Sequence, residues 1–276
     1  MTELKYTFKT DTLFKLLFTK YPDLLKRLVS ELLGIEYGDI AQFLITNPEM
    51  SPEEIGKKFC RLDINMIVDG RRINLEIQVD KEGNYPERSL FYWAREYSTA
   101  ISEGDDYALL PRTIIISILG FNQFSNPRKY RSRFQALEVT THEPLTDKLD
   151  LQFYELKKLP PLDETDSGRD LWLKLFRADT EEELAKIEKM GVPIMNEAIA
   201  AYRHVAASPE LRELERMRSK ARHDEAQALS DAKQEGRQEE KFEIARNAMQ
   251  MNIPIDGIVK LTGLTREEVE SLQITT

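Results

Sequence analysis

Two carboxylates and an amide lie on either side of a short turn signal in the first third of the chain. Asp63 precedes the dipeptide Asp69-Gly70, and Glu76 and Gln78 follow it. Asp-Gly between two alternating runs is a strong signal for a two-residue hairpin loop. Carboxylate oxygens are ligands that Mg²⁺ prefers, and one or two of them often suffice. The residues therefore predict a divalent-metal site if the two strands bring them together.

The two strands of this hairpin alternate between apolar and polar side chains, so each strand has one polar face. We predict the strands over residues 61–68 and 72–79. A two-residue loop pairs Asp63 with Glu76, a four-residue loop pairs it with Gln78, and either register leaves all three on one face. Because adjacent carboxylates repel each other, a cation or a proton between them would stabilise the arrangement. The alternative is an exposed polar face of an edge hairpin.

The elements around the hairpin are predicted to form a mixed sheet with helices packed on it. In chain order we expect a helix, the hairpin, a second helix, a buried strand and two more strands, over residues 11–33, 61–79, 86–102, 113–119, 134–141 and 149–156. Thr10 or Asp11 is the predicted N-cap of the first helix, and Gly34 ends it. The β-branched run TIIISIL is typical of a strand buried on both faces. Helices on either side imply that the polar face of the hairpin is partly covered.

After Leu159-Pro160-Pro161 the sequence is predicted to be entirely helical. We divide the chain into a first domain, a helical segment, and a charged long helix with a short helical tail, over residues 1–160, 161–206 and 207–276. Thr265 and Glu268 form a predicted capping box before the last helix. That helix has Arg266 as its only basic residue, so we do not expect it to read DNA. We expect the tail to be an assembly element, most simply for a homodimer.

Composition excludes several classes of protein. The net charge is −9: residues 1–160 hold 22 basic and 24 acidic residues, and the rest of the chain holds 17 basic and 24 acidic residues. This balance argues against a protein covered broadly by basic residues, but it allows a local surface that faces DNA. The sequence has no apolar run of about 18 residues, so we expect no membrane-spanning helix. The N-terminus has no apolar segment of the kind found in secretory signals. The single cysteine, Cys60, and three scattered histidines exclude an internal disulfide and a zinc finger. We expect a reducing, cytoplasmic location, with Cys60 as a small core residue.

The ordered set of motifs over the first domain resembles the recombination-promoting nuclease / putative transposase family of the PD-(D/E)XK nuclease superfamily. The matching residues are Asp11-x-x-Phe14-Lys15, Arg61-Leu62-Asp63, Asn74-Leu75-Glu76-Ile77-Gln78, Arg88 with Tyr92, and Gly104-x-x-Tyr107. The resemblance spans roughly residues 9–160, and the helical tail is similar to that family's C-terminal extension. It implies an α/β fold with an α/β/α nuclease core and a mixed sheet, followed by an all-helical extension.

The resemblance also implies metal-dependent endonucleolytic cleavage of DNA phosphodiester bonds, linked to recombination, transposition or defence against foreign DNA. Asp63 and Glu76 would bind Mg²⁺ or another divalent cation, which polarises a phosphoryl oxygen and activates a bound water. In the usual superfamily pattern a lysine takes the position of Gln78, and an amide can only form hydrogen bonds. The narrower family carries glutamine there. The alternative function is a catalytically inactive DNA- or protein-binding module with a relic nuclease site.

Three residues of the first helix are candidates for supporting roles at this site. Lys15 would supply the positive charge that Gln78 lacks, or it is an ordinary surface lysine. Asp11 would be a third acidic group near the metal, or it is the N-cap of the helix. Glu31 lies on the same predicted helix and is the other candidate for the acidic role.

Two further groups are candidates for contacts with DNA. Arg88 and Tyr92 are one turn apart on one helix face, where they would contact phosphate, support Glu76 through a hydrogen bond, or form a structural pair against the sheet. The most basic stretch of the chain contains Arg128, Lys129, Arg131 and Arg133. It lies between predicted strands, so we expect a loop that either contacts the DNA backbone or is simply solvated.

Overall fold

The computed structural model describes residues 2–47, 63–81 and 83–272. The chain divides into two compact units, one with the described residues up to Glu215 and one that begins at Arg216. The predictions for Cys60, and for the start of the first hairpin strand at Arg61 and Leu62, fall outside the described residues.

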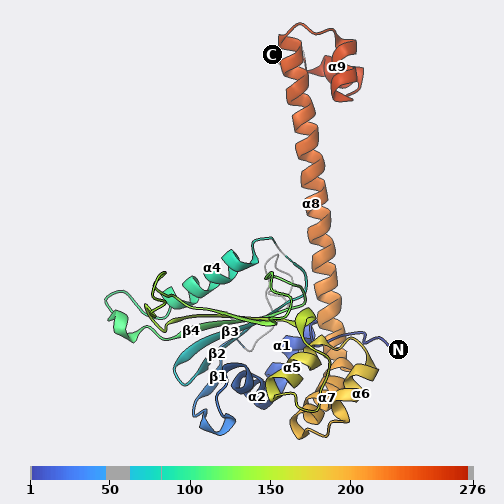
Figure 1. Ribbon diagram of the computed structural model, residues 1–276. Helices are drawn as coiled ribbons and strands as arrows, with labels where there is room; N and C mark the ends of the chain where they lie inside the picture. The colour runs from blue at the N-terminus through green and yellow to red at the C-terminus, as the bar shows by residue number, and fades with distance from the viewer. Residues whose placement is uncertain (1, 48–62, 82, 273–276) are drawn as a thin grey trace. The chain divides into compact units, whose positions relative to one another are not determined.

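A six-stranded sheet forms the centre of the first unit, in the order β1-β2-β3-β4-β6-β5 (Figure 1). Its strands are β1 (Phe43–Ile45), β2 (Ile64–Val68), β3 (Arg71–Gln78), β4 (Thr113–Leu119), β5 (Arg131–Phe134) and β6 (Leu149–Glu155). The strands β3, β4 and β6 run parallel, and the other neighbours are antiparallel. Every residue of β4 is buried, as expected for a strand covered on both faces. The predicted mixed sheet is therefore confirmed.

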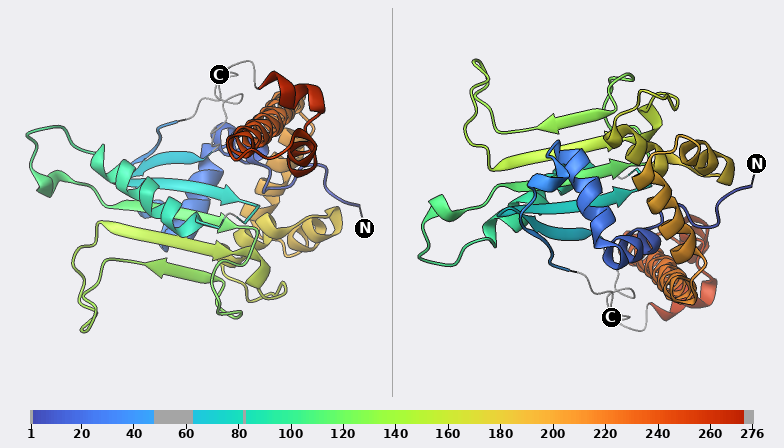
Figure 2. Two further views of the ribbon diagram at one scale, coloured as in Figure 1. Left: turned by 90° about the horizontal axis from the view of Figure 1, so that it is seen from above. Right: turned by 90° about the horizontal axis from the view of Figure 1, so that it is seen from below.

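Helices cover both faces of this sheet (Figures 1 and 2). The helices α1, α2 and α5 pack on one face and α4 lies on the other; they span Asp11–Lys20, Pro22–Leu33, Gly168–Arg177 and Tyr85–Ser98. Alternate side chains of β4 divide between the two faces. Ile114 and Ile116 join the large core with α1 and α2, whereas Ile115 and Leu119 join a smaller core under α4. This confirms the α/β/α core.

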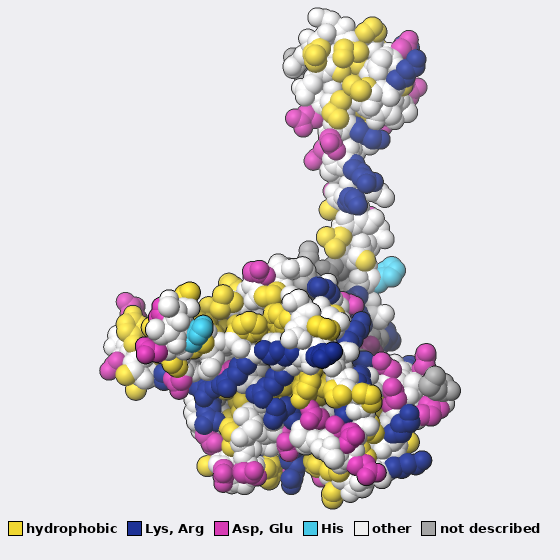
Figure 3. Space-filling view, in the orientation of Figure 1, with side chains coloured by type: hydrophobic (Ala, Val, Ile, Leu, Met, Phe, Trp, Pro, Cys, Tyr) yellow, Lys and Arg dark blue, Asp and Glu magenta, His cyan; other side chains and the backbone are white. Residues whose placement is uncertain are grey.

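The helix α4 rests on the sheet with few buried residues. Only Tyr85 and Ser89 are fully buried, and apolar side chains remain exposed over this helix (Figure 3). Trp93 anchors it by donating a hydrogen bond of 3.1 Å from Nε1 to the carbonyl oxygen of Thr113. The helix ends at Ser98 rather than at the predicted residue 102.

The predicted first helix is broken in two at Tyr21 and Pro22. Proline lacks a backbone N–H and restricts the residue before it, so one helix ends and the next begins there. Thr10 occupies the N-cap position of α1, but its hydroxyl accepts a bond from Thr7 instead of capping the helix. Gly34 ends α2 in the left-handed region, as predicted.

The strand predicted over residues 134–141 is displaced toward the N-terminus. The structure places β5 at Arg131–Phe134, so the second half of the basic stretch is strand and not loop. Glu138 accounts for the early end, because its carboxylate accepts bonds from the backbone N–H groups of Thr140 and Thr141 and closes a turn. His142 follows with a positive φ of 59°. The last predicted strand is confirmed as β6.

The remainder of the first unit is helical, as predicted. Its helices are α5, α6 (Glu181–Glu188), α7 (Pro193–Ala206) and the start of α8 (Pro209–Gln250). Earlier in the chain, single 3₁₀ turns occur at Tyr37–Asp39, Tyr107–Leu109 and Leu156–Lys158. The start of α8 belongs to the core of this unit, because Leu211 is fully buried and Thr12 donates a hydrogen bond to Glu215.

The second unit consists of the rest of α8 with α9 (Ile255–Thr262) and α10 (Arg266–Ser271). A small apolar core joins Ala248 of α8 to Ile258 and Val269. The predicted capping box of Thr265 and Glu268 is confirmed at the start of α10. Although α8 is long, neither it nor another helix in the described ranges combines the length and apolarity needed to cross a membrane.

Candidate active site

The hairpin between β2 and β3 has the two-residue loop. Asp69 and Gly70 have positive φ angles of 47° and 74°, and Val68 pairs with Arg71. Such a loop matches the twist of the strands it joins. The pairing continues to Ile64 opposite Leu75. This loop length is that of the first of the two predicted registers, and Asp63 is the residue just before Ile64 at the open end of the hairpin.

Asp63 is held at the open end of the hairpin by side chains from three segments. Asn74 of β3 donates hydrogen bonds from Nδ2 to the Asp63 carboxylate and, at 2.7 Å, to Oδ1 of Asn65. Lys15 of α1 donates to the Asp63 carbonyl oxygen at 2.8 Å, and Asn47 does so at 3.1 Å. Lys15 is only 2% exposed, so it is a buried residue and not a surface lysine.

Glu76 lies in the middle of β3, buried beside Ser117 of β4. Arg88 reaches it from α4: its Nη2 is 3.3 Å from Oε1 of Glu76 and 3.0 Å from Oε1 of Gln78. The Nε2 of Gln78 donates in turn to the carbonyl oxygen of Asp80 at 3.1 Å. The side chains of Arg88 and Glu76 are 14% and 8% exposed, so water screens this ion pair weakly. The structure thus brings Glu76, Gln78 and Arg88 together.

Three buried oxygens near Glu76 form no hydrogen bond of good geometry among the described residues, and they belong to the side chains of Asn74, Tyr85 and Ser117. The Tyr85 hydroxyl nevertheless lies close to both Ser117 and Glu76. Burial raises the pKa of the Tyr85 hydroxyl well above its ordinary value, and the Glu76 carboxylate raises it further, so this group is neutral. Buried polar atoms are normally satisfied by protein or by ordered water. The oxygens therefore fit a site that holds water or a hydrated cation.

The donor set suits a hard divalent ion. Asp63 and Glu76 supply two carboxylates, and no group of three His, Cys, Asp or Glu side chains placed to hold a metal occurs in the described ranges. Mg²⁺ is commonly bound by one or two carboxylates and completes its shell with water and substrate phosphate. An oxygen-only set with neutral hydroxyl and amide groups around it fits that chemistry and not that of a closed zinc site.

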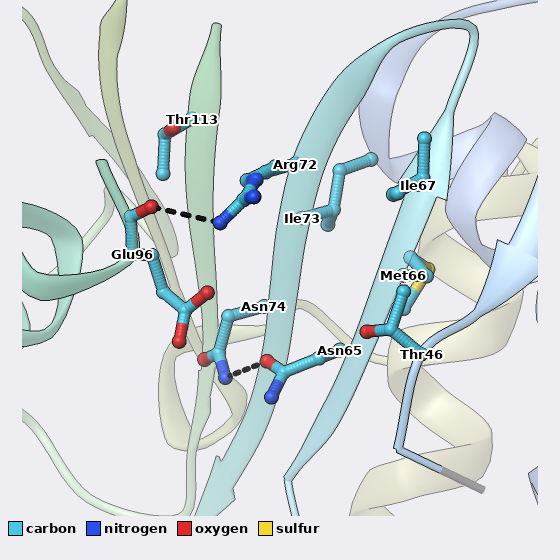
Figure 4. A pocket seen from close by; sticks show the side chains of 9 residues that line it. All are labelled: Thr46, Asn65, Met66, Ile67, Arg72, Ile73, Asn74, Glu96 and Thr113. Atoms are coloured by element: carbon cyan, nitrogen blue, oxygen red, sulfur yellow. Dashed lines mark hydrogen bonds between the residues drawn. The ribbon is translucent and has the colours of Figure 1, made fainter. Parts of the chain in front are cut away.

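A pocket of about 150 Å³ opens on the face of the sheet under α4, between β2, β3 and α4 (Figure 4). Asn65 and Asn74 form one part of its wall, and Arg72 and Glu96 form another. Arg72 donates to the carbonyl oxygen of Glu96 at 3.1 Å and so links β3 to α4. The pocket is large enough to hold ordered water molecules. Asn74 lies between this pocket and Asp63, because it lines the pocket and donates to the Asp63 carboxylate.

The other candidates lie at varied places around this site. Asp11 is in the first turn of α1, one turn before Lys15, so the two share one side of the helix. Glu31 lies elsewhere, beside Gly168 at the N-terminus of α5, because a Cβ added at Gly168 would overlap the Glu31 carboxylate. The dipole of α5 stabilises the negative charge of Glu31 there. Tyr92 is one turn beyond Arg88, with its ring centroid 5.3 Å from the Arg95 guanidinium.

The basic stretch is not brought together with Asp63 and Glu76. Arg131 and Arg133 project from β5 to the face that carries Tyr154, whereas Glu76 projects to the face under α4. Arg133 is ion-paired with Asp150, at 2.7 Å. The preceding residues, Arg128 and Lys129, are exposed before β5 begins.

The family comparison agrees with this geometry. Residues 8–232 match the model of the PD-(D/E)XK nuclease family transposases. The chain belongs to this family. PD-(D/E)XK nucleases generally use divalent metal ions, and membership supports a nuclease or transposase type of function with DNA as the substrate. Searches of curated proteins and of solved structures gave no significant match.

Within this candidate PD-(D/E)XK site, three residues have no role assigned to them from the sequence. Asn74 lies on the polar side of its strand, so the alternation that located Glu76 contained its signal. Ser117 is the single polar residue after Thr113 in the run TIIISIL, and a polar residue inside an apolar run is a recognisable sign of a special position in a buried strand. Tyr85 carried no such signal, since an aromatic residue before a proline is common.

Proposed function

We propose that the chain is a divalent-metal-dependent DNA endonuclease whose site is built on Asp63, Glu76 and Gln78. The observation that supports this proposal is that Asp63 and Glu76 lie on neighbouring strands of the hairpin, with Asp63 bonded to the polar side of β3 that also carries Glu76. Asn74 contacts one of them and Arg88 contacts the other. Membership of a nuclease family supports the same conclusion.

Asp63 and Glu76 would hold the metal ion, and Mg²⁺ fits their oxygen ligands best. When bound, the ion supplies a polarised phosphoryl oxygen and a water of lowered pKa. Lys15 and Asn74 orient Asp63 from its carbonyl and carboxylate sides. Arg88 balances the charge of Glu76 and offers N–H donors in a geometry that matches phosphate oxygens.

Gln78 has a positioning role in this scheme. Its amide oxygen accepts from Arg88 and its amide nitrogen donates to Asp80, so both ends are fixed. An amide cannot take a proton from water at neutral pH. Gln78 therefore orients Arg88 and neighbouring water, while charge is supplied by Arg88 and the buried Lys15. Asp11 and Tyr92 remain supporting candidates at the rim.

Nicking of a supercoiled plasmid tests the proposal. Wild-type protein is expected to cut with Mg²⁺ and not with EDTA, and Asp63→Ala and Glu76→Gln are expected to be at least about 100-fold slower. Glu87→Gln is the matched control, because Glu87 is an exposed carboxylate on α4. Cutting by Asp63→Ala at the wild-type rate would exclude this site.

A second candidate function is a DNA- or protein-binding module with a relic nuclease site. Two features favour it: Gln78 stands where a lysine is usual, and Arg88 already neutralises Glu76. This alternative predicts folded protein that binds DNA equally with Mg²⁺ and with EDTA and does not nick it. The plasmid experiment, combined with a binding measurement, separates the two functions.

The C-terminal helices are proposed to assemble the protein as a homodimer. Apolar side chains are exposed along the second unit, among them Leu229 at 55%, Met251 at 74% and Leu261 at 63%. Burying such side chains against a second copy is favourable by about 25 cal/mol per Å² of apolar surface. A dimer of nucleases would present two sites to DNA, which suits a role in recombination, transposition or defence against foreign DNA.

A further inference from the structure

A positively charged region lies apart from the candidate active site. Residues 107–137 contain five basic residues and no acidic one, in a chain whose net charge is −9. The five are Arg112, Arg128, Lys129, Arg131 and Arg133. Figure 3 shows Lys and Arg side chains gathered over the β5 edge of the sheet. Such a local surplus of positive charge attracts polyanions even when the whole protein is acidic.

The strand β5 presents two of these arginines on an accessible face. It is an edge strand, with Arg131 paired to Tyr154 and Arg133 paired to Gln152 of β6. Residues two apart on a strand share a face and are about 6.7 Å apart. This face is the one on which α1 and α2 pack, but those helices leave β5 uncovered (Figure 2).

A buried carboxylate fixes two arginines at this face. Arg133 donates two hydrogen bonds to Asp150, at 2.9 and 2.7 Å, and Arg112 donates one at 2.5 Å. Burial alone would raise the pKa of Asp150, but the bonds from the two guanidinium groups outweigh it and lower the pKa below its usual range. Asp150 is 0% exposed, whereas the arginine side chains are 39% and 28% exposed. One charge therefore holds two guanidinium groups whose outer N–H groups face water.

Arg131 adds a third guanidinium beside this pair. Its central carbon lies 5.8 Å from the ring centroid of Tyr154, and it forms no ion pair with an acidic residue in the described ranges. The Nε atoms of Arg131 and Arg112 are buried without a hydrogen-bond partner among the described residues. The three guanidinium groups are thus balanced by the single carboxylate of Asp150, which leaves a local charge of +2.

We infer that Arg112, Arg131 and Arg133 form a binding site for backbone phosphates of DNA, separate from Asp63 and Glu76. Pre-positioned guanidinium groups match phosphate oxygens and need little ordering on binding. The inference rests on the proposed function only in taking DNA as the ligand. Because this face is opposite to that of Glu76, the site contacts phosphates remote from the bond that is cut. It contributes to affinity and not to the chemical step.

Binding of a fluorescein-labelled 30-base-pair duplex, measured by anisotropy in EDTA, tests this site without cleavage. Arg131→Gln is the main variant, since Arg131 is outside the buried ion pair and its loss leaves Asp150 with both partners. We expect about fivefold weaker binding and a slope of log affinity against log salt that is smaller by about 1. Lys189→Gln, at the exposed end of α6, removes the same charge elsewhere and is expected to bind as wild type.

The plasmid assay supplies a second readout. Arg131→Gln is expected to raise KM and leave kcat within about twofold, because the lost contact is equal in ground and transition states. Binding by Arg131→Gln that equals the Lys189→Gln control would overturn the inference while the nuclease proposal stands. Weaker binding by Arg131→Gln in a protein that never nicks DNA would support the inference and exclude the nuclease. A lower kcat with unchanged affinity would also overturn it.

Discussion

Asn74 donates a hydrogen bond across the hairpin to the carboxylate of Asp63. The bond fixes a metal-binding candidate on one strand from the middle of the next strand. Asn74 is itself held by its bond to Asn65, and its own amide oxygen lies buried beside the pocket in Figure 4. The orientation of Asp63 is therefore set by an amide of the protein itself.

Replacing Asn74 is expected to impair cleavage more than stability. Asn74→Ala removes a hydrogen bond to a charged group, which is worth about 1.5–3 kcal/mol, so cleavage should slow about 10- to 100-fold. Asn65→Ala is the matched control, because it removes the other partner of Asn74 and leaves the bond to Asp63. Plasmid nicking at saturating Mg²⁺ measures both variants. Equal rates for the two variants would remove Asn74 from the site.

Arg88 neutralises Glu76, as a divalent ion bound there would, so the two are expected to compete. Arg88→Gln should lower the Mg²⁺ concentration for half-maximal activity about fivefold, which corresponds to about 1 kcal/mol of coupling. Its maximal rate should fall, because a donor to phosphate is lost. Arg88→Lys retains the charge and should keep the wild-type Mg²⁺ requirement. A Mg²⁺ titration of nicking rates measures this, and an unchanged midpoint in Arg88→Gln would contradict the competition.

Sequence patterns predicted the hairpin that carries the candidate site better than the elements around it. The Asp69-Gly70 signal and the alternation of both strands predicted the hairpin, its polar face and one of the two registers correctly, because these are local properties. The burial of Lys15 was not predicted, since it depends on how α1 packs against the chain near Asp63. The ion pair of Arg133 was not predicted for a similar reason, because its partner Asp150 lies on a different strand.

Errors in the predicted elements have equally specific causes. The sequence predicts one continuous helix across Tyr21 and Pro22, because the leucines keep a helical spacing through the break. The strand β5 was placed too late because the apolar residues after Phe134 resemble a strand, whereas Glu138 closes a turn there through side-chain bonds to the backbone. Side-chain capping of this kind competes with strand formation and leaves little trace in hydrophobic patterns.

The ion pair of Asp150 is expected to make stability depend on pH in the acid range. Its pKa is lower in the folded protein than the unfolded value of about 3.9, so its contribution is fully present above that pH. The contribution is lost as the pH falls through the lowered pKa. Asp150→Asn should cost about 2 kcal/mol at pH 7, less than for a fully buried pair because both arginines are partly exposed.

Thermal unfolding between pH 7 and pH 3 measures this effect. The difference in Tm between wild type and Asp150→Asn should narrow below about pH 4, where the wild type begins to lose the ion pair. Asp147→Asn is the control, because Asp147 is exposed and close in sequence. A difference in Tm that stays constant down to pH 3 would show that the ionised form of Asp150 does not stabilise this edge of the sheet.

The proposed dimer leads to a truncation whose end point the structure defines. The first unit includes the start of α8, since Leu211 is buried there and Glu215 accepts a hydrogen bond from Thr12. A chain ending at Lys220 should therefore fold, whereas one ending near Arg203 would lose part of the core.

Removing residues 221–276 deletes Leu229, Met251 and Leu261, whose exposed side chains would form part of the dimer interface. We expect light scattering after size exclusion to report a dimer for the full chain and for a chain ending at Leu272, and a monomer for the shorter one. The same oligomeric state for all three would exclude assembly through the C-terminal helices.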